Sequence, residues 1–561
     1  MKKLFPILMV LGFVATSCGE RTGQDAERPN IILIMTDDVT FDHWSAYGGN
    51  FPTPHIEHLA TAGMLFHQAY TTSAACTPSR YSIMTGQYPG RCKADEFLDK
   101  NPENQPYVIA WNTPITEDNM TLHEVMNQAG YETGYIGKFH IGELGFERPG
   151  VNPDIPVIDP DLSPDTDEAD SLLRIYQKVV SERVKELTGA GYAGAIQWAN
   201  PETLPLKAIK HHNLEYQVWG TRNFFQSLTG EKPFFLTINS TALHGPNIFA
   251  DLQNTSPVYS AEGRIDALQH IMPSRSSIFE RLADLGYKYG EGVPDHVNHY
   301  LAGKIWMDDQ LGAIMKMLRE YGLDENTLVI YTADHNIEPG KSTIYNRGVN
   351  VPFLAWWPGK IKPGSQSYDH VQFIDFLPTF AELAGVEVDT DEIVDGKSFA
   401  GVLDGPQLID DRVLYFEEGY TRGVTNGKYK YIAMRFPEPV LDSLEARITN
   451  TISHMGSKRA YHASIAMEYY PAFFDADQLY DLEKDPYEQN NLAGDPKYAD
   501  ELAEMKKQLD AILATFDHPF DLGANGFADE AYYREAAEAA MAIGTGWIPW
   551  WNREIDFPPS E

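Results

Sequence analysis

The stretch that decides the fold is NIILIMTDD, residues 30–38, where an unbroken apolar run ends in two adjacent aspartates. A strand with one wet face alternates apolar and polar residues, whereas an unbroken run suits a strand buried on both faces of a parallel sheet. Neighbouring side chains on a strand point to opposite faces, so Asp37 and Asp38 converge only where the strand ends. The stretch therefore predicts a buried strand followed by paired carboxylates.

Three further stretches repeat this pattern of an apolar run followed by polar residues. They are YETGYIGKFHIG (131–142), KPFFLTINSTALHGP (232–246) and NTLVIYTADHN (326–336). Their polar ends supply Lys138 and His140, then His244, and then Asp334, His335 and Asn336. Four apolar runs that all end in polar side chains indicate one shared site.

Helical patterns separate these runs. TLHEVMNQAG (121–130), YLAGKIWMDDQLGAIMKMLREYG (300–322) and FIDFLPTFAELAG (373–385) carry apolar residues at helical spacing and end at glycine. Alternating strands and helices predict an α/β fold, with a mostly parallel sheet flanked by helices. In such sheets ligands bind at the carboxyl ends of the strands, where the polar residues are expected.

The pattern changes after about residue 405. RVLYFEEGYTRGVTNGKYKYIAM (412–434) reads as strands joined by an Asn-Gly turn, and YADELAEMKKQLDAILATF (498–516) as a helix. We therefore expect a smaller C-terminal α+β subdomain, and we interpret residues 150–230, rich in Pro, Asp and Tyr, as an insertion near the site. The expected division is an export signal (1–18), a catalytic domain (28–405), an antiparallel-sheet subdomain (406–520) and a tail packing on the body (521–561, with Trp547, Trp550 and Trp551).

The charge balance limits the partners. The 561 residues carry a formal net charge of -36, which argues against nucleic acid or an anionic membrane surface as a partner. A small anionic substrate is still compatible, because a site can be cationic inside an acidic protein.

The N-terminal stretch MKKLFPILMVLGFVATSCGE combines lysines, a short apolar run and small residues, the layout of a bacterial export signal. Its cysteine resembles a lipoprotein signal, in which Cys18 becomes the lipidated first residue; ordinary cleavage that releases a soluble protein is the alternative. The expected location is the periplasm or a lipid tether at the outer membrane of a Gram-negative bacterium, with no membrane contact beyond that lipid.

Cys76 opens the segment CTPSRYSIMTG (76–86), and Cys92 is the other cysteine outside the signal. A Cys76–Cys92 disulfide, an inert buried thiol and a precursor of a more reactive group are all open from spacing alone. The aspartates favour a divalent cation, because a cation relieves repulsion between like charges. A carboxylate-rich site suits Ca²⁺ or Mg²⁺ better than zinc, although a solvated loop would also explain an isolated Asp-Asp pair.

The segment 76–86 resembles the signature of the type I sulfatases, Cys-x-Pro-Ser-Arg followed by a hydrophobic pair and Thr-Gly. The other motifs follow in family order over residues 28–515, with GKFHIG (137–142) in place of the usual Gly-Lys-Trp-His, so that Phe139 replaces a tryptophan. The chain is identified as a member of this formylglycine-dependent family of the alkaline-phosphatase-like superfamily.

This resemblance implies that a separate maturation enzyme oxidises Cys76 to Cα-formylglycine. One hydroxyl of the aldehyde hydrate then attacks sulfur and the other expels sulfate. The implied ligands of the cation, Ca²⁺ by family habit and less often Mg²⁺, are Asp37, Asp38, the modified Cys76, Asp334 and His335, with Asn336 as a competitor for the last position.

The resemblance also assigns roles to the remaining motif residues. Arg80 should orient the hydrated aldehyde, and Lys138 and His140 should contact the nucleophile and the sulfate. His244 and Lys341 match positions that contact the sulfate and protonate the departing oxygen. A separate candidate sugar subsite, which comes from position in the chain alone, comprises His211, His212 and Trp219.

The expected function is hydrolysis of sulfate esters on sulfated carbohydrates, either algal polysaccharides or host glycans. One alternative is a phosphonate or phosphodiester hydrolase of the same superfamily. Another is a non-catalytic lipoprotein that binds sulfated glycans, against which the intact Cys76 and its partner residues argue.

Overall fold

The computed structural model describes residues 28–523 apart from 42–43, 50, 103, 105, 246–247, 254–258, 266–270, 288–294, 338, 389–392, 406–411, 437–465 and 467–468. Cys18, the expected signal and the three tail tryptophans lie outside the described residues. No helix in the described part of the chain is both long and apolar enough to cross a membrane.

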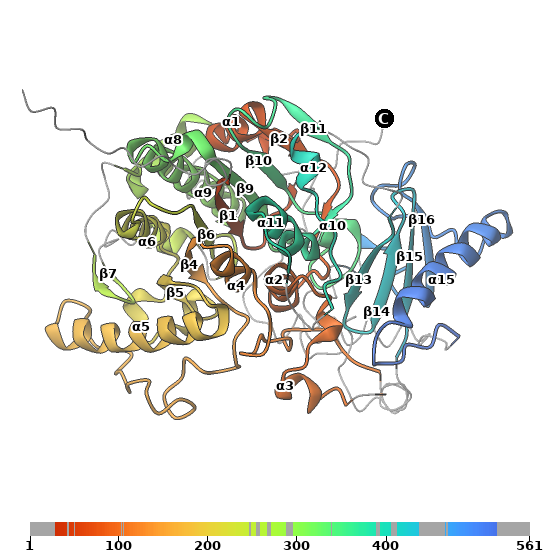
Figure 1. The fold of residues 1–561 in the computed structure, drawn as a ribbon, viewed down its shortest axis with the longest axis horizontal. Coiled ribbons are helices and arrows are strands. Elements are labelled where there is room, and N and C mark those ends of the chain that lie inside the picture. The colour runs from red at the N-terminus through yellow and green to blue at the C-terminus, as the bar shows by residue number, and fades with distance from the viewer. Residues whose placement is uncertain are drawn as a thin grey trace, which may run out of the picture.

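A central eight-stranded sheet organises the molecule, in the order β11-β2-β10-β9-β1-β6-β4-β5 (Figure 1). Its strands are β1 Asn30–Thr36, β2 Met64–Phe66, β4 Glu132–Lys138, β5 Tyr192–Gln197, β6 Phe234–Asn239, β9 Thr327–Ala333, β10 Phe353–Trp356 and β11 Ser365–Ser367. The strand β1 pairs in parallel with β6 and β9, and only β10 runs antiparallel to its neighbours. The predicted, mostly parallel α/β sheet is therefore confirmed.

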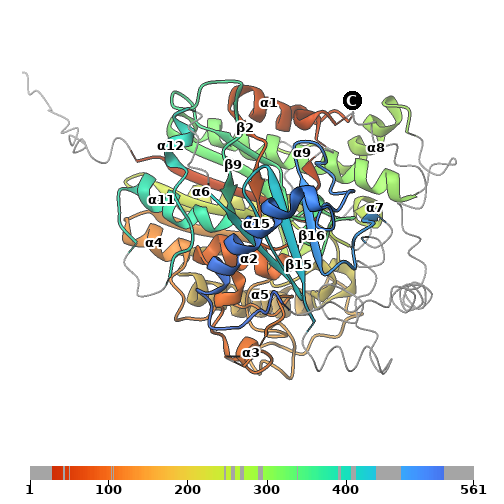
Figure 2. The same cartoon turned by 90° about the vertical axis from the view of Figure 1, so that its right-hand side faces the viewer.

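Helices flank this sheet on both sides, as Figures 1 and 2 show. One group that is in mutual contact comprises α2 Cys76–Thr85, α4 Leu122–Gln128 and α11 Phe376–Ala384. The other gathers on α9 Asp295–Glu320 and comprises α1 Pro54–Ala62, α6 Leu214–Ser227, α7 Ile248–Gln253 and α8 Arg275–Asp284. The other α-helices that the structure describes in the main body are α3 Asp95–Leu98, α5 Asp167–Thr188, α10 Asn346–Val349 and α12 Ala400–Leu403.

Local signals explain where the predicted helices begin and end. Thr121 and Glu124 form a capping box at the start of α4, each side chain bonding the other's main-chain N–H. Gly385 follows α11 with φ +73°, a left-handed conformation that glycine adopts without a steric penalty. The three helices predicted from periodicity are confirmed.

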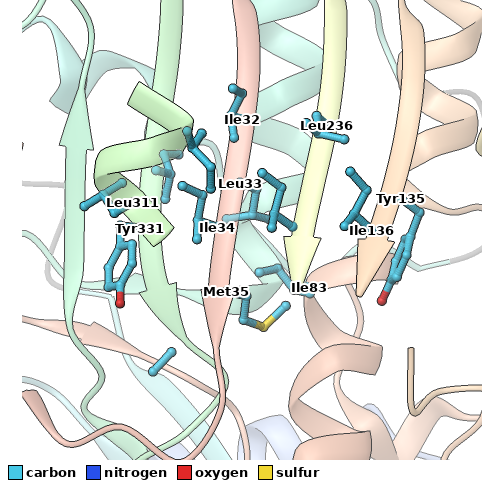
Figure 3. Close-up of a cluster of buried hydrophobic side chains, with 14 of the residues drawn as sticks. Ile32, Leu33, Ile34, Met35, Ile83, Tyr135, Ile136, Leu236, Leu311 and Tyr331 are labelled. Atoms are coloured by element: carbon cyan, nitrogen blue, oxygen red, sulfur yellow. The ribbon is translucent and has the colours of Figure 1, made fainter. Parts of the chain in front are cut away.

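The core lies between the sheet and its helices (Figure 3). Ile32, Leu33 and Ile34 of β1 are at most 1 % exposed, and Ile83 of α2 and Leu311 of α9 lie in the same cluster. This two-sided burial explains why the strand sequences do not alternate between apolar and polar residues.

The prediction of an insertion over 150–230 is wrong for its second half. The strand β5 is the edge strand of the central sheet, paired in parallel with β4, and α6 packs on both of these strands. The segment therefore contains a regular βα unit. Its small-residue strand YAGAIQ lacks the bulky apolar run that marks the other strands.

A second, four-stranded antiparallel sheet follows, as predicted. Its strands are β13 Leu414–Glu418, β14 Thr421–Thr425, β15 Tyr429–Met434 and β16 Asp477–Asp481. The Asn-Gly turn joins β14 to β15, with φ +89° at Gly427, and α15 Ala499–Leu513 packs against β14 and β15 on the outer side (Figures 1 and 2). The other face packs on the main body, since Phe416 and Ile432 lie in one buried cluster with Tyr70 and Tyr345. At the edge of the sheet, Glu417 of β13 donates its main-chain N–H to the carbonyl of Thr72 at 3.0 Å.

Candidate active site

The candidate site forms at the carboxyl edge of four adjacent strands, in the order β9, β1, β6 and β4. Asp37 and Asp38 follow β1, Asp334 and His335 follow β9, and Lys138 is the last residue of β4. Because these strands run parallel, their carboxyl ends meet at one edge. The strand pairing thus brings together residues that are almost 300 positions apart in sequence, such as Asp38 and Asp334, whose Oδ1 accepts the main-chain N–H of Asp38 at 3.4 Å.

Cys76 is the first residue of α2 and points into this edge. Its Sγ lies 3.7 Å from Oδ1 of Asp37 and 3.2 Å from Nε2 of His335, and the residue is 1 % exposed. Cys76 and Cys92 are both free thiols, and Cys92 bonds the carbonyl of Pro114 instead. The structure thus contains no Cys76–Cys92 disulfide.

Ligand atoms of Asp37, Asp38, Cys76 and His335 all lie within 4.8 Å of one another, and all four residues are buried. Nδ1 of His335 donates to the carbonyl of Asn336 at 2.8 Å, which leaves Nε2 directed at the group. Oδ2 of Asp334 lies 2.9 Å from Nη2 of Arg80, and Oδ1 of Asp334 lies 3.8 Å from Nε2 of His335. This buried set of carboxylates and one imidazole fits a divalent cation that prefers oxygen ligands.

Each carboxylate of the site is paired with a buried cation. Nζ of Lys138 lies 2.5 Å from Oδ2 of Asp37, and Nζ of Lys341 lies 2.6 Å from Oδ2 of Asp38. Arg80 completes the set through Asp334. Because burying an unpaired charge is costly, these pairs explain how so many charges remain in the interior.

The same charges shift the acidities of the site. Burial alone would raise the pKa of Asp37, but Lys138 and the other nearby cations hold it well below its ordinary value. Burial would also raise the pKa of the Cys76 thiol, yet Lys138 and His335 bring it below the ordinary value. For His335 burial lowers the pKa, and the charges of Asp334 and Cys76 raise it to about 10.

The two other predicted histidines, His140 and His244, lie at the rim of the same site. Burial and the charge of Lys138 hold the pKa of each well below its ordinary value. Nδ1 of His140 is buried without a hydrogen-bond partner among the described residues, and Nδ1 of His244 donates to the carbonyl of Gly245 at 2.7 Å. The structure therefore brings the motif residues predicted for catalysis and metal binding to one edge of the sheet. The predicted sugar subsite is not confirmed, because His212 is fully buried and Trp219 stacks on Tyr216 of α6 against the core.

Two residues of the site escaped the sequence argument. Asn239 ends β6 and its Oδ1 accepts a hydrogen bond from Nη1 of Arg80 at 3.3 Å; the rule used for the other strand ends could have found it. Glu418 of β13 is fully buried, bonds the hydroxyl of Ser73 and lies close enough to His335 for its charge to lower the Glu418 pKa, although burial raises that pKa to about 8 overall. No signal in the sequence links the second sheet to this site.

The sequence also matches known families. Residues 29–386, more than half of the chain, match the family model described as Sulfatase, and residues 339–434 match that of the N-sulphoglucosamine sulphohydrolase C-terminal region. The N-acetylgalactosamine-6-O-sulfatase of Bacteroides thetaiotaomicron is 27 % identical over 91 % of this chain and 99 % of that protein. An ulvan-active sulfatase of Formosa agariphila is 26 % identical over 85 % of this chain and 78 % of its own.

Solved structures share the fold. One of them, described as a complex with its substrate D-glucosamine-2-N,6-O-disulfate, covers 87 % of this chain and 98 % of its own, with a TM-score of 0.54 and 20 % identity. This match shows a shared fold, in addition to the match to the family models and the signature residues gathered at the site. The chain belongs to the sulfatase family, as a type I sulfatase of the alkaline-phosphatase-like superfamily.

Proposed function

We propose that this sulfatase removes sulfate from sulfated carbohydrates, with Cys76 oxidised to formylglycine and a Ca²⁺ ion bound beside it. The observation that carries the proposal is the buried group of Asp37, Asp38, Cys76 and His335 with its paired cations. The relatives named for N-acetylgalactosamine 6-sulfate and ulvan support a carbohydrate substrate.

The charge balance of the site supports both the cation and an anionic substrate. The carboxylates Asp37, Asp38 and Asp334 are matched in number by the cations Lys138, Lys341 and Arg80. Asp37, Asp38, Asp334 and His335 would hold the divalent ion, with an oxygen of the modified Cys76. A bound ion would make the site net positive and supply a Lewis acid for developing negative charge.

His335 is our candidate for the fourth protein ligand, because its Nε2 lies 3.2 Å from Sγ of Cys76 and belongs to the buried ligand group. Asn336 stays the competitor: its amide nitrogen donates to the carbonyl of Asn350 at 2.5 Å, and its Oδ1, the atom that would bind a cation, is buried without a hydrogen-bond partner among the described residues. Because a ligating imidazole must be neutral, metal binding at His335 would release a proton.

The chain's own side chains then orient the reacting groups. Arg80 lies on α2, four residues after Cys76, is held by Asp334 and Asn239, and would orient the oxygen atoms on residue 76. Lys138 and His140 contact the nucleophile and the sulfate, and Lys341 contacts the sulfate. His244 donates Nδ1–H to a carbonyl, so its Nε2 is the atom that would carry a proton to the departing sugar oxygen.

We also propose that the protein is exported, and is either released into the periplasm or held at the outer membrane by a lipid on Cys18. The support is the N-terminal sequence MKKLFPILMVLGFVATSC. Replacement of Cys18 by alanine, with fractionation of the cells, tests the lipid: the protein should move from the membrane to the soluble fraction.

The function is tested on protein produced with and without a maturation enzyme. Mass spectrometry of the tryptic peptide that contains Cys76 should show loss of sulfur only in the coexpressed protein, and only that protein should release sulfate. The substrates are N-acetylgalactosamine 6-sulfate, N-acetylglucosamine 6-sulfate, ulvan oligosaccharides and the matching phosphate esters. Faster turnover of the phosphate esters, or activity with an intact thiol, would contradict the proposal.

A further inference from the structure

The loop that carries His244 has an unusual main chain. Its described part runs from the end of β6 at Asn239 to Gly245. Leu243, directly before His244, has φ +73°, a left-handed conformation that is strained for a residue with a branched side chain. Such a conformation persists only where the surroundings hold it in place.

We infer that His212 and Asp251 are positioning residues that hold the main chain of His244, and so set where its imidazole stands in the sulfatase reaction. The inference rests on the proposed role of His244 as proton donor. It replaces the expectation that His212 lines a sugar subsite, because His212 is fully buried.

His212 bonds the loop at two points. Its Nε2 lies 2.8 Å from the carbonyl oxygen of His244, and its Nδ1 lies 2.9 Å from the hydroxyl of Thr241. A carbonyl oxygen only accepts, so Nε2 carries the hydrogen and donates it to His244. The imidazole of His212 therefore bonds residues on both sides of Leu243, Thr241 before it and His244 after it.

Asp251 fixes His212 from the other side. The aspartate is buried on α7, and its Oδ2 accepts the main-chain N–H of His212 at 3.0 Å. Its Oδ1 accepts from Nδ1 of His211 at 2.8 Å. Nη1 of Arg275 in turn donates to the main-chain carbonyl of Asp251 at 2.8 Å, so the anchor of the loop is itself held by α8.

The packing leaves the loop little alternative space. Leu243 lies against Gly303 of α9, where an added Cβ would stand 2.3 Å from Cδ2 of the leucine. The side chain of Leu243 is 2 % exposed. Loss of the hydrogen bonds from His212 would therefore let the strained main chain relax while Leu243 stays buried, so that His244 is the residue that shifts.

The test is a double-mutant cycle between His212→Met, which keeps the volume but loses the donor, and His244→Ala. The substrates are 4-nitrophenyl sulfate, whose leaving group needs no proton, and the sugar sulfate that the matured enzyme hydrolyses. A misplaced catalytic group costs about 100-fold, and we expect a loss of that order in kcat/KM on the sugar for His212→Met. The loss should fall on kcat more than on KM and be much smaller on the aryl sulfate.

The decisive comparison is the double variant. If His212 acts through His244, His212→Met lowers activity no further in the His244→Ala background; if the two losses multiply, or if His212→Met loses nothing, the inference is wrong. If His244→Ala loses equally on both substrates, and His212→Met still adds no loss in the His244→Ala background, the proton-donor role is wrong and the positioning role stands.

Three further variants separate positioning from folding. His212→Gln keeps an amide donor at similar reach and should recover most of the activity. Thr241→Val removes only the hydrogen bond to Nδ1 of His212. If His212→Met does not fold, the double-mutant cycle is repeated with Thr241→Val and His244→Ala. His123→Gln removes another fully buried histidine, which bonds Gly134 under the sheet; it should lower stability and leave kcat/KM on both substrates unchanged.

Discussion

The two candidate proton donors, His244 and Lys341, differ in how the protein holds them. Burial and the charge of Lys138 depress the pKa of His244, so its imidazole is neutral at pH 7 until an anion binds nearby. Lys341 donates to both oxygens of Asp38, at 2.7 Å and 2.6 Å. A bound sulfate ester, being negative, favours protonation of the histidine and so prepares it only when substrate is present.

This difference predicts distinct kinetic losses. His244→Ala should lower kcat/KM on a sulfated sugar by a factor of about a hundred to ten thousand, the usual worth of a proton donor, and much less on 4-nitrophenyl sulfate. Lys341→Ala should affect both substrates alike if Lys341 contacts the sulfate itself, as proposed. The losses are compared as free-energy differences; a leaving-group dependence for Lys341→Ala alone would transfer the acid role to the lysine.

Single residues also mark the limit of prediction from sequence. Lys138 and the aspartates could be found because they follow apolar runs, and Cys76 and Arg80 because the segment 76–86 resembles the sulfatase signature. Glu418 could not be found, since it reaches the site from the second sheet, and its burial depends on how that sheet docks. Sequence separation hides such contacts even where each strand is predicted correctly.

At the level of elements, two adjacent strands share the proposed metal site. The carboxyl ends of β1 and β9 supply Asp37, Asp38, Asp334 and His335, and the register Thr36↔Ala333 places these ends side by side. A substitution on either strand should therefore affect the same ion.

Removal of one carboxylate from either strand should weaken metal binding and activity together. For Asp37→Asn and Asp334→Asn we expect at least about a tenfold loss of metal affinity, since even partners of metal ligands are worth that much. Metal content is measured by elemental analysis of the folded proteins. Asp375→Asn, which removes a buried carboxylate paired with Arg412 away from the metal group, should keep its metal. Full occupancy in both strand-end variants would place the site elsewhere.

The packing of α4 on the sheet predicts a pH effect on stability. Burial lowers the pKa of His123 from 6.5 to about 4. Between these values the unfolded chain binds a proton that the folded chain does not, so the free energy of unfolding falls as the pH falls from 6.5 towards 4. The single site corresponds to a loss of about 2 kcal/mol between pH 7 and pH 5.

Urea denaturation at both pH values measures this effect. The wild type should lose about 2 kcal/mol more than His123→Gln on acidification, and equal losses would show that His123 is not buried in its neutral form. Because the histidine lies away from the catalytic residues, sulfatase activity at pH 7 serves as a check that the variant is folded.

The elements themselves differ in how well the sequence predicts them. The strands β1, β4, β6 and β9 carry long apolar runs, and α4, α9 and α11 carry clear helical periodicity with glycine stops. The short strand β2 has three residues, too few for a periodicity to appear. The site could be predicted because it depends on the long central strands and not on the short outer ones.

For the whole molecule, the second sheet holds the segment that follows Lys341 through a buried ion pair, and we call this contact the brace. Nζ of Lys430 on β15 lies 3.0 Å from Oε1 of Glu488 and 2.9 Å from Oδ1 of Asn346, and Oε2 of Glu488 accepts the main-chain N–H of Asn346. Asn346 begins α10, which follows Lys341 closely in sequence. The two sheets are thus joined through the segment that carries a site residue.

Lys430→Met should destabilise the whole protein by about 3–5 kcal/mol, because it leaves the buried Glu488 without its cation. The variant Lys430→Met/Glu488→Gln should recover most of that loss. The melting temperature and the activity on 4-nitrophenyl sulfate are measured for both variants. If only the melting temperature changes, the brace supports folding without setting the position of Lys341.

The burial of α2 also determines whether the proposed oxidation of Cys76 comes before or after folding. All ten residues of this helix are buried, and Cys76 is 1 % exposed, so a second enzyme cannot reach the thiol of the folded chain. The proposed oxidation therefore has to occur while the segment is still an extended peptide, before the strands around it assemble. On this proposal, a molecule that folds before the oxidation keeps its thiol and lacks the nucleophile.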